Sequence, residues 1–80
     1  ACALGQASAS VLAKNVIGKN STDIQTVRDQ LEAMLIKNGP PPLGVWEALS
    51  ALNPAKDAKP RHGAILLPFD AVLKGLEDLK

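Results

Sequence analysis

The chain has 80 residues, and nine Lys and Arg against eight Asp and Glu give a formal net charge of +1. A chain of this length forms one compact domain, and so small a charge excludes a broad basic face for nucleic acid. Hydrophobic residues make up 46% and aromatic residues 2%, which favours helices rich in Ala and Leu over β-strands. The single Cys excludes an internal disulfide and a multi-cysteine zinc site. We therefore predict an all-α fold.

The first ten residues are small and uncharged, unlike the rest of the chain. We predict a flexible N-terminus over residues 1–8, followed by a single helical domain over 9–80. Ser8 or Ser10 is then the N-cap of the first helix. Alternatively, Ala7-Ser8-Ala9 is the remnant of a signal-peptidase site, because it has the small-x-small pattern.

Apolar spacing predicts a short first helix over about residues 9–18. Ala9, Ala13 and Ile17 share one face of that helix, with Leu12 and Val16 beside them at helical spacing. Gly18 is well placed to end the helix in the left-handed conformation.

The second helix is expected over about residues 22–38. Thr22 and Gln25 form a Thr-x-x-Gln capping box at its start, and Asn38 with Gly39 supplies a C-cap. Apolar residues repeat at intervals of three and four and predict one buried stripe: Ile24, Val27, Leu31, Met34 and Leu35.

Three consecutive prolines predict a short polyproline spacer, after which Pro42 begins a third helix over about residues 42–53. Pro54 is expected to end that helix, because proline cannot continue a helix beyond its first turn. Four of its apolar residues lie near one face: Leu43, Trp46, Leu49 and Leu52.

Residues 54–63 combine Pro, Gly and charge without periodicity, so we expect an exposed basic loop there. The apolar run 64–67 is interpreted as extended and buried. Pro68 then begins the last helix, over 68–80, in which Gly75 marks either a close approach of another backbone or simple tolerance. Its apolar stripe consists of Phe69, Val72, Leu73, Leu76 and Leu79. The result is a compact bundle of four short helices.

The sequence shows no catalytic constellation. His62 is the single His and is expected in the exposed loop, so it lacks the companions that a metal site or a general base requires. Cys2 has no basic neighbour to activate its thiol, and we interpret it as unused and dispensable for folding, with an intermolecular disulfide as the alternative. We therefore expect no enzyme activity, no cofactor and no metal.

Two predicted surface features could have a function. The local basic cluster of Lys56, Lys59, Arg61 and His62 is either a solvated loop or a contact for a phosphate, a lipid head group or an acidic protein. Asn20 begins an Asn-Ser-Thr sequon, which predicts a glycosylation site if the chain is secreted by a eukaryote.

The apolar stripes suggest a function in association. The preferred hypothesis is a small non-enzymatic interaction protein that binds itself or another protein chain through an apolar helix face. The predicted interface residues are Trp46, Leu49, Leu73 and Leu76. The alternative is a secreted toxin, effector or lipid-binding protein that acts at a membrane surface. Neither hypothesis involves nucleic acid.

Overall fold

The computed structural model describes residues 3–79, which are helical over most of their length and contain no β-strand. The all-α bundle predicted from the sequence is confirmed. Three α-helices and two 3₁₀ segments follow one another along the chain: α1 (Ala3–Asn15), α2 (Ser21–Ile36), η1 (Gly44–Asp57), η2 (Lys59–Arg61) and α3 (His62–Asp78).

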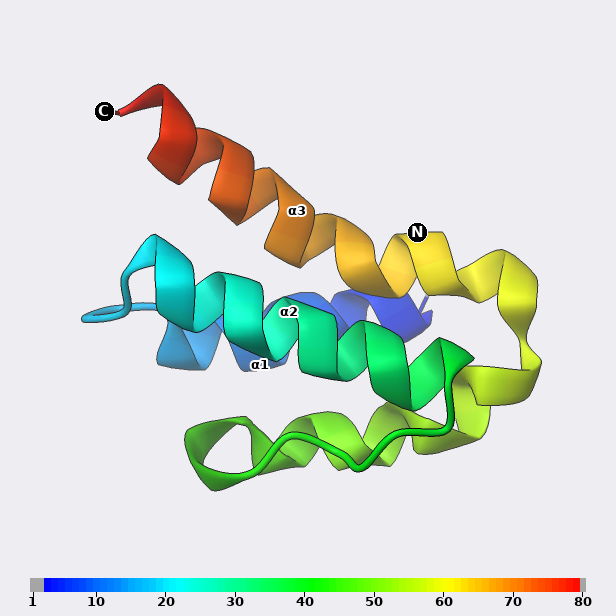
Figure 1. Ribbon diagram of the computed structural model, residues 1–80. Helices are drawn as coiled ribbons and strands as arrows, with labels where there is room; N and C mark the ends of the chain where they lie inside the picture. The colour runs from blue at the N-terminus through cyan, green and yellow to red at the C-terminus, as the bar shows by residue number, and fades with distance from the viewer. Residues whose placement is uncertain (1–2, 80) are drawn as a thin grey trace.

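The helices surround one core. In Figure 1, α1 lies behind α2, α3 crosses above them and η1 runs below. Helix α3 packs against both α1 and α2, and η1 packs against the same two helices from the other side. The Cα radius of gyration is 11.8 Å, close to the value of about 12 Å expected for a compact chain of this length.

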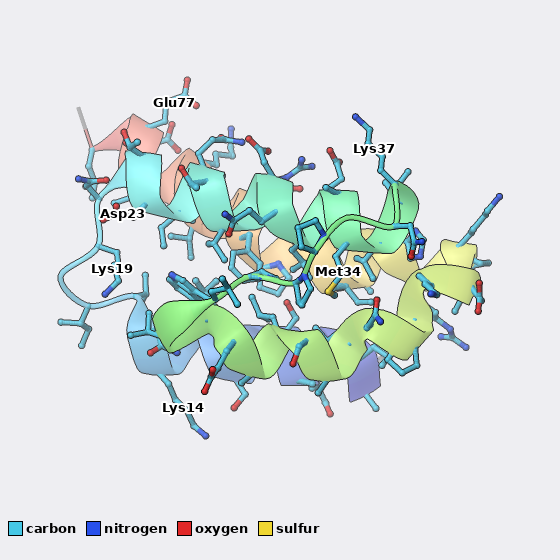
Figure 2. The ribbon with its side chains drawn as sticks, turned by 60° about the horizontal axis from the view of Figure 1, so that its bottom comes forward. Lys14, Lys19, Asp23, Met34, Lys37 and Glu77 are labelled. Atoms are coloured by element: carbon cyan, nitrogen blue, oxygen red, sulfur yellow. The ribbon has the colours of Figure 1, made fainter. Side chains whose placement is uncertain are left out.

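Helix α2 supplies the centre of this core. All five residues of its predicted stripe are at most 3% exposed, and Met34 points into the space between the helices in Figure 2. Trp46 of η1 and Phe69 of α3 meet beside them, with ring centroids 6.1 Å apart and planes tilted by 58°. Tilted aromatic pairs at this separation are favourable, so this contact joins η1 to α3 across the core.

The residue that caps the start of α2 is not the one predicted from the sequence. Asn20, not Thr22, is the N-cap: its Oδ1 accepts from the Asp23 backbone N–H at 2.9 Å, and the Asn20 N–H donates to Asp23 Oδ2 at 3.1 Å. Asn and Thr both cap helices, but the helix begins one residue earlier than expected. At the other end Asn38 has a φ of 55°, and the Gly39 N–H donates to the Ala33 carbonyl at 2.9 Å.

Helix α1 begins at Ala3, so residues 3–8, predicted to be flexible, form its first two turns. Residues 1 and 2, including Cys2, lie outside the described residues. Of the predicted apolar residues, Leu12 is buried and Val16 is partly buried against the core, whereas Ala13 is exposed and Ile17 is 90% exposed. Ser8 is buried as well. Gly18 adopts the left-handed φ of 83° that was predicted for the turn after the helix.

The third helix is a 3₁₀ segment that continues through Pro54 to Asp57, rather than an α-helix that ends at Asn53. Its buried residues explain this geometry, because they recur at every third position: Trp46, Leu49, Leu52 and Ala55. A 3₁₀-helix places such residues in one line, whereas in an α-helix each step of three rotates the side chain by roughly 60°. Leu43 precedes this segment and is 79% exposed.

The expected loop at 54–63 and strand at 64–67 are both wrong. Residues 59–61 form η2, and α3 begins at His62 and runs through Pro68. Proline within a helix lacks the N–H that would bond to the carbonyl four residues earlier, which here is Ala64, and its ring strains the helix at that carbonyl. Because α1 packs directly against Ala64, tertiary contact holds this stretch helical.

An ion-pair network joins α2 to α3 at the surface. Arg28 Nε donates to Asp70 Oδ1 at 2.9 Å, and Arg28 Nη1 lies 2.9 Å from Glu32 Oε2. Partial burial lowers the pKa of Arg28, but the hydrogen bond and charge of Asp70, together with Glu32, outweigh that effect and raise it. The guanidinium therefore remains charged, and such half-exposed pairs stabilise the fold by about 1 kcal/mol or less.

Candidate functional site at the His62 end of the bundle

The start of α1 and the start of α3 lie together at one end of the bundle, as Figure 1 shows beside the N label. A Cβ built on Gly5 would lie only 3.1 Å from the Ala64 carbonyl oxygen. One turn later, the buried Ser8 hydroxyl donates to the Ile65 carbonyl at 2.6 Å. Small residues at both positions let the two backbones approach closely. Helix α1, which follows Cys2 in the sequence, is thereby fixed to the helix that begins with His62.

His62 does not lie on an exposed loop. It is 9% exposed, and its Nε2 lies 2.9 Å from the Ala55 carbonyl oxygen of η1. A carbonyl oxygen can only accept, so Nε2 carries the hydrogen, and in the neutral ring the lone pair belongs to Nδ1. Histidines that bind metals are commonly oriented in this way, by donating the other ring N–H to a backbone carbonyl.

A hollow of about 340 Å³ opens beside His62, between the end of α2 and the connection from η1 to α3. Leu35 and Ile36 of α2 contribute its apolar lining, and Lys56 and Lys59 contribute its charge. A second hollow, of about 280 Å³, shares Leu35, Ile36 and Lys56 and adds Asn38 and Asp57 to the lining. We call the two together the Ile36 groove.

The structure thus brings three members of the predicted basic cluster, Lys56, Lys59 and His62, around one groove. Lys56 Nζ lies 3.4 Å from Asn38 Oδ1, a long contact across to the end of α2. Lys37 points away from the bundle in Figure 2 and does not line the groove. Arg61 is exposed and also makes a polar contact.

The four predicted interface residues do not form one exposed surface. Trp46 and Leu49 are 8% and 0% exposed and belong to the core, while Leu73 and Leu76 are partly buried and pack against it. No atom of the described residues lies within 4 Å of the Cβ position at Gly75, so within this bundle no backbone approaches that glycine. The apolar stripes of the helices chiefly fill the bundle itself.

Other sequence features have structural roles. The Asn20 side chain is exposed, and its oxygen serves as the cap of α2.

Among residues 3–79, no group of three or more His, Cys, Asp or Glu is arranged to hold a metal ion. Within the same range, none of the helices has both the length and the apolar character needed to cross a bilayer.

Comparison with known proteins gives one informative likeness. No family model matches the chain, and no curated protein matches it. The chain is similar to a solved structure from Brucella abortus, described as the N-terminal part of a nitrogen-fixing NifU-like protein. The two are 44% identical and superpose with a TM-score of 0.89. The match covers 98% of this chain and 56% of the other, so the chain spans little more than half of the length of that solved chain.

This likeness overturns the functional predictions made from the sequence. A plain interaction protein with an apolar helix face, and a secreted toxin, effector or lipid-binding protein, are both contradicted by it. The packing roles of Gly5 and Ser8 were not predicted, because both residues were assigned to a flexible N-terminus. The sequence did contain a signal for this packing: Gly5 and Ser8 are small residues three positions apart in an apolar segment, and such spacing permits two helices to pack closely.

Proposed function

We propose that this chain is the helical part of a scaffold on which an iron–sulfur cluster is assembled, as in the NifU-like proteins. The sequence identity of 44% over 98% of the chain supports this proposal. Because the chain spans 56% of the solved Brucella chain, the proposed role is that of a part, and the cluster is its cargo.

The observation that carries the proposal is the meeting of α1 and α3. Iron–sulfur clusters are held by Cys thiolates, and His replaces Cys in some centres. The chain has one Cys and one His. Cys2 directly precedes α1 in sequence, and the Gly5–Ala64 contact fixes the start of α1 beside the first turn of α3, where His62 lies. Cys2 thus directly precedes in sequence, and His62 begins, two helices whose first turns are packed together.

One Cys and one His do not complete a cluster site, which takes four protein ligands for two irons. The described residues provide no group of three or more metal-binding side chains. In the proposed scaffold the remaining ligands come from further protein, either a longer form of this chain or another subunit. This requirement agrees with protein partners and oligomerisation in NifU-like proteins.

We propose that the chain itself holds and orients ligands of the cluster and that it performs no catalysis. The Ala55 carbonyl keeps His62 Nε2 as the donor, so Nδ1 is the nitrogen with which the neutral ring would bind iron. The proposed partners are the proteins that deliver the components of the cluster and those that receive it.

Anaerobic reconstitution tests the proposal. The chain is supplied together with the further protein that completes the ligand set, either as a longer form or with the other subunit. This assembly is incubated with ferrous iron, sulfide and a thiol reductant, desalted, and assayed for bound iron, bound sulfide and visible absorption. We expect the complete assembly to retain both elements and its Cys2→Ser variant to lose most of them. His62→Gln should hold the cluster less tightly, because the Gln amide can still donate to Ala55 but offers no ring nitrogen.

Lys74→Gln is the matched control, since Lys74 is exposed on α3 and far along it from His62. Its iron and sulfide contents should equal those of the unchanged chain. Thermal unfolding of all variants checks that the fold persists. If the complete assembly retains no sulfide, or if its Cys2→Ser variant retains as much as the unchanged assembly, the scaffold role is wrong.

A further inference from the structure

The Ile36 groove combines an apolar floor with a positive rim. Leu35 is 3% exposed and forms the base, whereas Ile36 is 58% exposed although it is a large aliphatic residue at the end of α2. Covering such a side chain is favourable, at about 25 cal/mol for each Å² removed from water. The floor therefore offers a binding site for one aliphatic side chain.

The rim of the groove is basic. Lys56 and Lys59 border it from η1 and η2, while Asp57 is the one acidic residue among its lining residues. The contact of Lys56 with Asn38 is 3.4 Å long and involves a neutral partner, so it leaves the ammonium charge uncompensated. Carboxylates on a bound segment would pair with the ammonium groups of Lys56 and Lys59, which face water when the groove is empty.

We propose that the Ile36 groove docks a short acidic and aliphatic peptide segment of a partner protein. One aliphatic side chain of the segment packs on Leu35 and Ile36, and flanking carboxylates approach Lys56 and Lys59. Inorganic phosphate would use the rim but not the floor. A membrane surface is flat and would not enter a hollow of about 340 Å³. The proposal is independent of the cluster role, because neither iron nor sulfide takes part in it.

A pair of synthetic peptides tests this docking. The first is a capped hexapeptide of alternating Glu and Leu, and the second has Gln in place of every Glu. Each is titrated into the chain while NMR follows the Ile36 methyl groups and the backbone amides. We expect the Glu peptide to shift Ile36 and its neighbours, and to bind at least about tenfold more tightly than the Gln peptide at low salt.

Variants then locate the site. K56Q combined with K59Q should weaken binding of the Glu peptide by at least about tenfold, as expected when two rim charges are removed. The matched control is K14Q combined with K74Q, which removes the same charge from exposed positions on α1 and α3 and should leave affinity unchanged. Ile36→Ser should also weaken binding, and circular dichroism should show unchanged helicity in every variant.

Five outcomes would overturn the proposal. Equal binding of the Glu and Gln peptides would remove the role of charge, and equal loss in the two double-lysine variants would show a nonspecific effect. Shifts confined to another face, or no shift at millimolar peptide, would show that the groove is not the site. Binding to phosphatidylserine vesicles that K56Q with K59Q abolishes, without peptide binding, would assign the rim to a membrane instead.

Discussion

Gly5 and Gly75 both occupy α-helices, yet their surroundings differ completely. A Cβ at Gly5 would lie 3.1 Å from the Ala64 carbonyl oxygen and 3.6 Å from the Ala64 Cβ, whereas a Cβ at Gly75 would meet nothing within 4 Å. The nearest atom at Gly5 belongs to the backbone of another helix and cannot rotate away. Gly5 is therefore required by packing, and Gly75 is not.

Alanine at the two positions should have opposite effects on stability. Gly75→Ala gains helix propensity without a clash and should stabilise the chain by about 0.5–1 kcal/mol. Gly5→Ala gains less, because it lies in the first turn, and must push α1 from α3, so it should destabilise by about 1–2 kcal/mol. Urea unfolding followed by circular dichroism measures both. Stabilisation by Gly5→Ala would show that the two helices separate easily.

His62 shows why a side chain's role cannot be deduced from its neighbours in sequence. Arg61, His62 and Gly63 together resemble an exposed turn, and two prolines nearby strengthen that impression. The buried ring of His62 contacts the carbonyl of Ala55, seven residues earlier. That carbonyl can reach the ring only because η1 continues past Pro54. Without knowledge of that helix, no local pattern predicts the contact.

At the scale of elements, α2 was predicted well because its signals agree. Its five apolar residues recur at helical spacing, and all of them are buried. Two candidate capping boxes overlap at its start, however, and both have the required residue types. Choosing between Asn20 with Asp23 and Thr22 with Gln25 requires the backbone conformation, which is extended at Asn20.

This choice of cap can be tested by stability. Asn20→Ala removes the side chain that accepts from the Asp23 N–H, so it should destabilise the chain by about 1 kcal/mol. Thr22→Ala should change stability by less than about 0.5 kcal/mol, because Thr22 is an exposed residue of the first turn. Thermal unfolding of the two variants decides the matter. A larger loss with Thr22→Ala would restore the cap predicted from the sequence.

The errors at α3 and η1 have a common origin in proline. Pro68 was expected to begin a helix and Pro54 to end one, yet each lies inside its helix. A proline costs a helix one N–H bond and some strain, and the apolar residues on both sides compensate by packing into the core. Ile65 and Phe69, on either side of Pro68, are fully buried. Local propensity is outweighed by tertiary contacts that are not visible in the sequence.

At the scale of the molecule, stability should be distributed unevenly. Helix α2 has a complete cap and five buried residues, whereas η1 is a 3₁₀ segment of 14 residues. Runs of 3₁₀-helix longer than about four residues are uncommon, because their hydrogen bonds have poorer geometry.

We therefore expect the amides of η1 to exchange with deuterium before those of α2, through local opening that leaves the rest of the bundle folded. Native-state hydrogen exchange measured by NMR tests this order. Exchange of both segments at one common rate would instead show that the whole chain opens as a single unit. Early exchange of α2 would contradict its central place in the core.

The candidate site belongs to this scale as well, since its parts are distant in sequence. The basic residues of the Ile36 groove were identified from their clustering, but the apolar floor was not, because Leu35 and Ile36 precede Lys56 by about twenty residues and lie on another helix. Likewise, the packing of α1 on α3 joins positions separated by 57 residues. Composition and residue spacing do not predict contacts between residues so far apart in the sequence.

The proline spacer after α2 returns along the bundle, so α2 and η1 run in the same direction (Figure 1). Pro42 is buried where η1 begins, but Pro40 and Pro41 are exposed. These two rings therefore add little to folded-state contacts. Their effect belongs to the unfolded ensemble, where fixed φ angles leave the connection fewer conformations to lose on folding. Part of what holds the bundle together is thus a restriction that exists before any helix has formed.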